Sequence, residues 1–419
     1  MRHCFCLRET PELTAALGEV RPLPTESVPC TQALGRVLGG DVQTPLSWPP
    51  FPRSTRDGFA VRAVDTATAT ALTPVALRCT GTSPVGGVPA GVLHTGETWR
   101  VVTGSALPEG ADAVVMQEDA ALEGAGLGAL CRVFTPIAPG EHIMAAGHDL
   151  RWGDGLACGG YPLRAHTVAL LAQFLTHIPV RRRPVLGILA TGDEFCHAQP
   201  DTPMEQASPL PSNAILLECL GKTHGAQVVQ LGTVPDVADA LRERLLHALE
   251  DQLAPCDVLV VFGGSSGGPR DCTARAIASL PGCRLYGRDQ IVSTGRPLTL
   301  ARAGHTWLWG LPGHAMGLSL AAHVFLVPML RRLAGMAEAT GNGSSRMARL
   351  AHALPAQSMV TEHYPVALTS RGGCPTAWPV RGGTGRLALL RDLSGWISLR
   401  GGARKGLRQG AAVRVHLFS

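Results

Sequence analysis

Residues 256–271 read CDVLVVFGGSSGGPRD, and this stretch indicates the fold more directly than any other part of the chain. Val258 to Phe262 are continuously apolar and mostly β-branched, as expected for a strand buried on both faces of a parallel sheet. Glycines and serines follow at once, and Asp271 ends the loop. Because glycine lets backbone N–H groups approach an anion, the loop predicts a site for a phosphate-bearing molecule beside a carboxylate. A flexible turn between a strand and a helix is the alternative.

Two further strand ends carry similar loops. The apolar run 185–190 is followed by Thr191-Gly192-Asp193-Glu194, and the run 306–309 by Gly310-Leu311-Pro312-Gly313. A further strand is expected at 227–231, and helical patterns alternate with the strands at 213–220, 237–249, 272–280 and 316–333. This alternation predicts a doubly wound parallel sheet in an α/β domain, with the three loops at one rim.

Carboxylates gather at this predicted rim. Asp193 and Glu194 are adjacent in the chain, and Asp271 ends the neighbouring loop. Their hard oxygen atoms suit Mg²⁺ bound to a phosphate. The alternative is that Asp193 and Glu194 only begin a solvated helix, where acidic residues are favoured in any case.

The rest of the chain is organised differently. Short strands separated by Gly/Pro turns are expected at 74–80, 97–102, 111–118 and 128–135, which predicts a small β domain. Helices are expected at 11–17, at 31–38 with Thr31 as N-cap, and at 165–175. After residue 340, short strands at 364–368, 387–390 and 413–418 predict a small β-barrel or sandwich.

Composition excludes several classes of protein. The 419 residues are 45% hydrophobic and 16% charged, which is typical of folded globular domains. No uninterrupted apolar run reaches the ~18 residues that a membrane helix needs, and the first residues lack the apolar core of a signal peptide. We therefore expect a cytoplasmic protein that does not enter membranes.

Positive charge is modest and scattered. The net charge is +5, and the single basic run is Arg181-Arg182-Arg183. We interpret this run as the solvated approach to a strand, so nucleic-acid binding is not expected.

A series of motifs occurs in one order along the chain. They are Pro49-Pro50-Phe51, Asp57-Gly58-Phe59-Ala60-Val61, Thr103-Gly104, Pro108 to Val115, Gly147-His148-Asp149, Thr191 to Glu194, Ser212-Asn213, Gly263-Gly264 with Ser266, Gly268 and Asp271, Gly295 with Pro297-Leu298, and Gly310 to Gly313. In this order and spacing the chain resembles the molybdopterin molybdenumtransferase family, which includes bacterial MoeA and the E domain of gephyrin.

The resemblance implies an elongated four-domain fold of α/β plus β type. A linker domain would comprise residues 10–42 and 143–177, a small β domain 43–142, a MogA-like molybdopterin-binding α/β domain 178–336, and a C-terminal β-barrel-like domain 340–419. It also implies a homodimer, with a molybdopterin adenylyltransferase as a partner protein.

The reaction implied by the resemblance converts adenylylated molybdopterin (molybdopterin-AMP) and molybdate into molybdenum cofactor and AMP, with Mg²⁺ as cofactor. Catalytic positions would be Asp57, Asp193, Glu194 and Asp271, and the last three would also be the metal ligands. Positions that bind molybdopterin and its phosphate would be Thr103, Gly104, Asp149, Gly192, Gly263, Gly264, Ser266, Gly268, Arg296, Pro312 and Gly313.

The chain departs from the family pattern mainly at basic positions. Ser293-Thr294-Gly295-Arg296-Pro297 stands where Lys-Pro-Gly-Lys-Pro is typical, His314-Ala315 follows Gly313 in place of Asn-Pro, and Met144-Ala145-Ala146 is uncharged. We predict that Arg53 and Arg56, in the loop before Asp57, replace the lost cations together with Arg296; for Arg53 and Arg56, solvated surface arginines are the alternative.

Two other functions compete with molybdenum insertion. One is a non-catalytic or tungstate-directed paralogue that binds molybdopterin or scaffolds cofactor-biosynthesis partners. The other is an unrelated phosphotransferase on a similar sheet, which the ordered motifs before residue 150 disfavour.

Overall fold

The computed structural model describes residues 5–88, 91–193, 212–251, 255–264, 272–292, 296–337, 344–355, 359–370, 373–380, 388–401 and 406–418. Two compact units are present, and each is described by itself. Unit 1 comprises residues 1–40, 159–168 and 176–419, and unit 2 comprises residues 41–158 and 169–175. The four-domain division expected from the sequence is finer than this and stays a prediction.

Unit 1 is built on a six-stranded sheet in the order β15-β14-β16-β19-β18-β17. The parallel strands are β14 (Val185–Thr191), β15 (Gln227–Val234), β16 (Val258–Phe262) and β19 (Thr306–Leu311). They confirm the predicted sheet. Its antiparallel edge, β17 (Cys283–Val292) and β18 (Arg296–Ala303), was not predicted, because charged residues interrupt the apolar pattern there.

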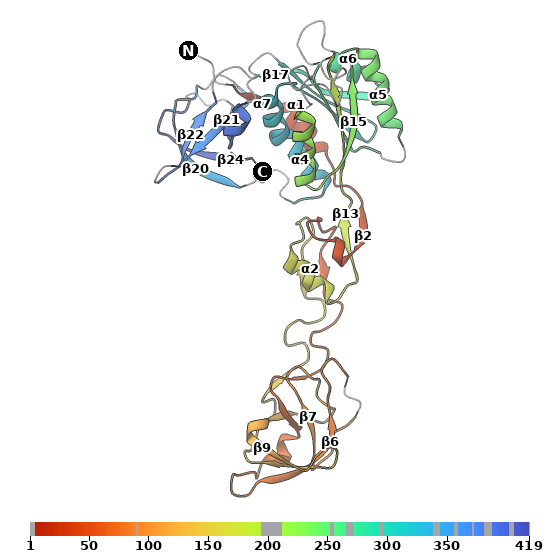
Figure 1. The fold of residues 1–419 in the computed structure, drawn as a ribbon, viewed down its shortest axis with the longest axis vertical. Helices are drawn as coiled ribbons and strands as arrows, with labels where there is room; N and C mark the ends of the chain where they lie inside the picture. Colours follow the sequence, from red (N-terminus) through yellow and green to blue (C-terminus); the bar gives the residue numbers. More distant parts are fainter. Residues whose placement is uncertain are drawn as a thin grey trace, which may run out of the picture. The chain divides into compact units, whose positions relative to one another are not determined.

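Helices cover both faces of this sheet (Figure 1). One face carries α1 (Pro11–Glu19), α4 (Ser212–Thr223) and a continuous helix made of α7 (Ala315–Ala321), the π-helical turn η4 (Ala322–Leu326) and α8 (Val327–Leu333). The other face carries α5 (Ala238–Glu250) and α6 (Cys272–Ala278). The predicted helices at 213–220, 237–249, 272–280 and 316–333 are thereby confirmed.

The helix Ala315–Leu333 is the one helix in the described part of the chain that is long and apolar enough to cross a membrane. Its apolar window is 78% buried. Trp309 of β19 stacks on Phe325 of this helix, with ring centroids 5.9 Å apart. The apolar composition is therefore that of a core helix packed on a sheet.

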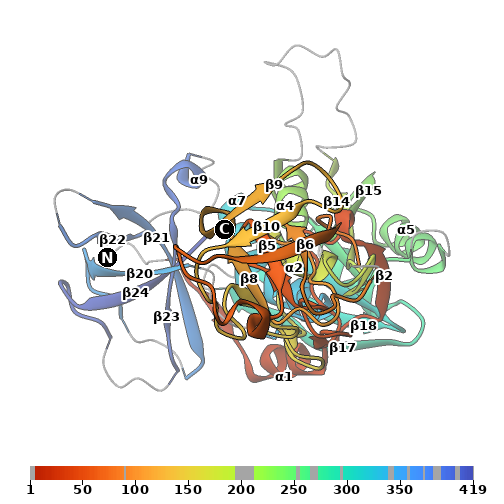
Figure 2. The ribbon, with the colours of Figure 1, turned by 90° about the horizontal axis from the view of Figure 1, so that it is seen from below.

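A closed β-barrel follows in the C-terminal part of unit 1 (Figure 2). Its strands are β20 (Ser345–Leu350), β21 (Thr361–Thr369), β22 (Thr376–Pro379), β23 (Gly395–Leu399) and β24 (Ala412–Leu417), and β21 closes it by pairing with both β22 and β23. The N-terminal strand β1 (Leu7–Glu9) joins β21. The strand expected at 387–390 is wrong: Leu389–Asp392 is the short helix α9.

Unit 2 contains a six-stranded sheet in the order β8-β5-β7-β6-β10-β9. The strands are β5 (Gly58–Val61), β6 (Val75–Thr82), β7 (Glu97–Val101), β8 (Ala113–Met116), β9 (Ala120–Glu123) and β10 (Leu130–Val133). Phe59, Leu77 and Val115 lie in its core. The small β domain and its four predicted strands are confirmed.

Short strand pairs and turns make up the remainder. The pairs are β4 (Arg53–Ser54) with β11 (Ile143–Met144), β3 (Val42–Gln43) with β12 (Gly155–Ala157), and β2 (Thr25–Pro29) with β13 (His177–Arg181). Helix α2 spans Ala165–Ala172. The helix expected at 31–38 is wrong. Only the 3-10 turn Cys30–Gln32 forms, because Gly35 turns the chain at φ +73° and Leu38 bridges to Val180.

Candidate functional site

The loops that follow β14, β16 and β19 meet at one rim of the unit 1 sheet, as predicted. Gly263 has φ +97°, and a Cβ there would lie 1.9 Å from the carbonyl oxygen of Thr191. A Cβ on Gly313 would lie 3.4 Å from Gly263 Cα. Glycine at 263 is therefore required both by the backbone conformation and by the close approach of the neighbouring loop.

The start of α4 fixes the loop after β19. The Asn213 side chain is buried, and its Nδ2 donates to the Gly313 carbonyl oxygen at 2.8 Å. Its Oδ1 has no hydrogen-bond partner among the residues that the structure describes. A buried polar atom without a partner costs free energy, so this oxygen is a natural acceptor for a ligand group at the rim.

Two carboxylates occupy the same rim. Asp193 follows β14, and Asp236 follows β15. Thr191 Oγ1 donates to Asp236 Oδ1 at 2.9 Å, and the Asp236 backbone N–H donates to Asp193 Oδ1 at 3.2 Å. Asp236 was not among the predicted site residues. The sequence places Asp236 between the strand expected at 227–231 and the helix expected at 237–249, in the same kind of strand-to-helix loop as the predicted site residues.

Several predicted site positions are not placed by the structure. Glu194, Ser266, Gly268 and Asp271 lie outside the described residues, and Arg296 is described only through the backbone of β18. Over the described ranges, no three His, Cys, Asp or Glu side chains form a metal-binding group. Asp193 and Asp236 nevertheless offer the hard oxygen atoms that Mg²⁺ takes from proteins, usually one or two carboxylates beside phosphate and water.

The predicted site positions in unit 2 centre on Asp57. Its Oδ1 accepts hydrogen bonds from the Thr103 backbone N–H at 2.6 Å and from Thr103 Oγ1 at 2.9 Å. These bonds hold the pKa of the exposed Asp57 carboxyl below its ordinary value. The bond from the Thr103 backbone has the larger effect and the bond from its hydroxyl the smaller one. Gly104, at φ +87°, donates its N–H to the Ser54 carbonyl oxygen at 2.8 Å. The structure therefore brings Asp57, Thr103 and Gly104 together.

Asp149 and Arg53 lie around Trp48 of unit 2. The Asp149 backbone N–H donates to the Trp48 carbonyl oxygen at 3.1 Å, and the Asp149 side chain is exposed. The Arg53 guanidinium lies 5.0 Å from the centre of the Trp48 ring. Arg53 is half-buried, and its Nε has no hydrogen-bond partner in the described part of the chain. Arg56, by contrast, is exposed.

Arg53 also faces the segment that lacks the family's basic residues. In the β4–β11 pair, Arg53 lies opposite Met144. A cation at 53 thus stands one strand away from the uncharged run at 144–146. This placement favours the prediction that Arg53 replaces a lost cation over the alternative that it is a solvated surface arginine. For Arg56, which is exposed, the structure gives no such support.

Comparison with known proteins agrees with this architecture. Residues 9–174 match the family model described as the MoeA N-terminal region (domain I and II), and residues 187–332 match one described as a probable molybdopterin binding domain.

Individual relatives cover most of the chain. A molybdopterin molybdenumtransferase from Nostoc sp. is 33% identical over 321 residues, covering 75% of this chain and 70% of that protein. One from Bacillus subtilis is 31% identical over 399 residues, covering 94% and 90%. The solved structure of a MoeA protein of molybdopterin biosynthesis from Pyrococcus horikoshii covers 97% of this chain and 98% of its own, with a TM-score of 0.76 and 26% identity. The chain belongs to the molybdopterin molybdenumtransferase family.

Proposed function

We propose that this protein is a transferase that inserts molybdenum into adenylylated molybdopterin, forming molybdenum cofactor and releasing AMP. Molybdopterin-AMP and molybdate would be its substrates. The observation that carries the proposal is the rim of the unit 1 sheet, where the described residues that follow β14, β16 and β19 lie close together beside the carboxylates Asp193 and Asp236. Ligands of open α/β sheets bind at this edge.

Each part of the rim suits a part of the substrate. Backbone N–H groups around Gly263 and Gly264 would bind the phosphate, whereas the Gly192 N–H donates to the Val234 carbonyl oxygen at 3.1 Å. The Oδ1 of Asn213, which has no hydrogen-bond partner among the described residues, would accept a hydrogen bond from the pterin or the nucleotide. Asp193 and Asp236, with Glu194 and Asp271, would hold Mg²⁺. When bound, Mg²⁺ supplies positive charge that offsets the charge of the phosphoanhydride.

Asp57 and Arg53 would bind the molybdate. The exposed Asp57 carboxyl is ionised at physiological pH, and its hydrogen bonds from Thr103 lower its pKa further, so Asp57 would act as a hydrogen-bond acceptor. Arg53, held against Trp48, would supply a cation for the oxyanion. A homodimer that assembles the site from two subunits, an adenylyltransferase that delivers the substrate, and a cytoplasmic location remain part of the proposal.

A turnover assay with purified protein tests the activity. Molybdopterin-AMP is incubated with Mg²⁺, with and without molybdate, and AMP is quantified by chromatography. We expect AMP release that requires both molybdate and Mg²⁺. Substrate binding without molybdate-dependent AMP release would instead support the non-catalytic paralogue. Equal rates with and without Mg²⁺ would remove the metal from the proposal while leaving the activity standing.

A further inference from the structure

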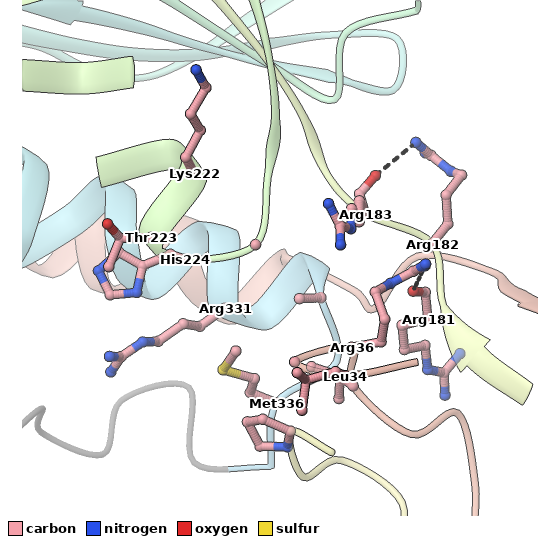
Figure 3. Close-up of a pocket in the computed structure, with 15 residues that line it drawn as sticks. Leu34, Arg36, Arg181, Arg182, Arg183, Lys222, Thr223, His224, Arg331 and Met336 are labelled. Atoms are coloured by element: carbon pink, nitrogen blue, oxygen red, sulfur yellow. Dashed lines mark hydrogen bonds between the residues drawn. The ribbon is translucent and has the colours of Figure 1, made fainter. Parts of the chain in front are cut away.

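A pocket of about 520 Å³ lies in unit 1 at the start of β14, the end of that strand opposite to Thr191 (Figure 3). Four segments and Pro162 line it: the segments are the turn at 34–37, residues 181–183 between β13 and β14, the end of α4 at 222–225, and the end of α8 at 331–336. None of these residues belongs to the proposed sites for molybdopterin, molybdate or Mg²⁺.

Positive side chains dominate the lining. Six arginine and lysine side chains reach the pocket, and none of the described residues that line it is acidic; the six are Arg36, Arg181, Arg182, Arg183, Lys222 and Arg331. In Figure 3 the first four lie on one side of the cavity, with Lys222 and Arg331 on the other. Like charges that share a cavity repel one another, and a bound anion relieves that repulsion.

Some of these cations already have carboxylate partners outside the pocket. Arg36 pairs with Glu26, Lys222 with Glu218 at 2.6 Å, and Arg182 with both carboxylate oxygens of Asp257 at 2.7 and 3.0 Å. These three pairs offset part of the charge of the pocket.

Arg181 and Arg183 have no such partner within the described ranges. Arg181 Nη1 donates to the Leu23 carbonyl oxygen at 3.1 Å, and its side chain packs against Gly335. The Arg183 side chain makes no hydrogen bond or ion pair to another described residue, and it is exposed at the pocket. The basic run expected to be only a solvated approach to a strand therefore helps to form a cavity.

Helix ends do not account for all of this charge. The carbonyl ends of α4 and α8 each carry about half a negative charge, which favours a basic residue in the last turn. Lys222 of α4 and Arg331 of α8 occupy those positions. Arg181 and Arg183 belong to neither helix, so the charges of helix ends do not explain their presence.

The buried His224 lies beside the same positive charges and adds none of its own at neutral pH. Burial first, and the neighbouring Arg331 second, lower the pKa of His224 to about 4. At neutral pH the imidazole is therefore uncharged, and the arginines and Lys222 supply the positive charge of the pocket.

We propose that this pocket binds a small organic phosphate, with the phosphate held by Arg181 and Arg183. Arginine suits this role because its planar guanidinium can donate two parallel hydrogen bonds to a phosphate. Leu34, Val37 and Pro162 offer apolar surface for the organic part. The volume lies in the range of small-molecule sites, roughly 300–1,000 Å³. The site is separate from the proposed molybdopterin site.

Calorimetric titration of the full chain at low ionic strength tests the proposal, with ADP and inorganic pyrophosphate as probes. Arg183→Ala should weaken ADP binding roughly ten-fold or more, the effect of losing a charge-assisted contact. Arg346→Ala is the matched control, because Arg346 is an exposed arginine of β20 outside the pocket. Asp193→Ala, at the sheet rim, should leave this binding event unchanged.

Three results would overturn the assignment. Equal ADP affinity in the parent and in Arg183→Ala would show that Arg183 does not contact the ligand. Pyrophosphate binding as tight as ADP binding would exclude an organic ligand. A dimer that dissociates in Arg183→Glu, by light scattering, would make the pocket a contact between two copies of the chain.

Discussion

At the scale of single residues, Asp57 shows how two short hydrogen bonds change the pKa of a side chain. Both donors come from Thr103, which lies 46 positions further along the chain. They favour the ionised carboxylate, so the folded pKa lies below the ordinary value. Stability from this contact is therefore present above the unfolded pKa and is lost as the pH falls through the folded pKa.

Thr103→Val removes the hydroxyl donor and keeps the backbone donor. We expect the pKa of Asp57 to rise toward its ordinary value without reaching it, because the backbone N–H bond persists. The measurement is a carbon-detected NMR titration of the Asp57 carboxyl group. Thr103→Ser, which retains a hydroxyl, is the control and should leave the pKa near that of the parent. A pKa that Thr103→Val does not change would mean that the hydroxyl bond contributes nothing.

Arg53 is the second case at this scale. Arg53→Ala should raise the molybdate concentration needed for half-maximal turnover by roughly ten- to hundred-fold, because a charge-assisted contact is lost. Arg53→Lys should recover only part of the loss, since lysine keeps the charge but lacks the planar guanidinium that lies over the Trp48 ring. Arg56→Ala should have a smaller effect because Arg56 is exposed. Parent-like behaviour of Arg53→Ala at every salt concentration would make Arg53 a structural residue.

At the scale of elements, the rim exists because strand ends and glycine loops fit together closely. The loop after β16 passes so near to Thr191 that residue 263 has no room for a side chain. Thr273 Oγ1 of α6 donates to the Gly263 carbonyl oxygen at 3.0 Å and so ties the loop to the next helix. Shape is thus set by contacts between elements that are distant in sequence.

Gly263→Ala should destabilise the protein by at least about 3 kcal/mol, because it adds a clash with backbone to an unfavourable φ. The matched control is Gly232→Ala in β15, where φ is +85° but nothing lies within 4 Å of an added Cβ. That variant should cost only about 1–2 kcal/mol, the cost of the left-handed conformation. Urea unfolding followed by tryptophan fluorescence compares the two. If both variants lose the same free energy of unfolding, the loop moves to make room for the added Cβ and the close approach does not contribute to stability.

At the scale of the whole molecule, the candidate site residues divide between the two units. Asp57 and Thr103 belong to unit 2, whereas Asp193, Asp236 and the loop at Gly263 belong to unit 1. A site assembled from two subunits, as the family resemblance implies, would require a dimer for activity.

Mixed dimers test that arrangement. Asp57→Ala chains and Asp271→Ala chains are each expected to be inactive, and their mixture should regain part of the activity, because some heterodimers contain one intact site. Mixing each variant with itself is the control. Light scattering that shows an active monomer, or a mixture that stays inactive although heterodimers form, would rule out a shared site.

Much of the fold follows from local sequence. The buried strands Val258–Phe262 and Val185–Thr191 are short apolar runs that end in glycine loops, a pattern typical of parallel strands buried on both faces. Where the local signal was weak, the prediction was wrong. A helix was expected at 31–38, but the chain turns at Gly35 and only a 3-10 turn forms before it. A strand was expected at 387–390, but Leu389–Asp392 forms the short helix α9.

By itself the sequence determined the family, the parallel sheet, the small β domain and most candidate site residues, because these depend on periodicity and on motifs of adjacent residues. Only the tertiary structure decided that Asp236 joins Asp193, that Arg53 lies against Trp48, and that Arg181 to Arg183 line a pocket. The first and the last of these facts depend on residues far apart in the chain, and the second depends on how the loop between Trp48 and Arg53 folds. Their proximity results from strand order and helix packing, which no local pattern specifies.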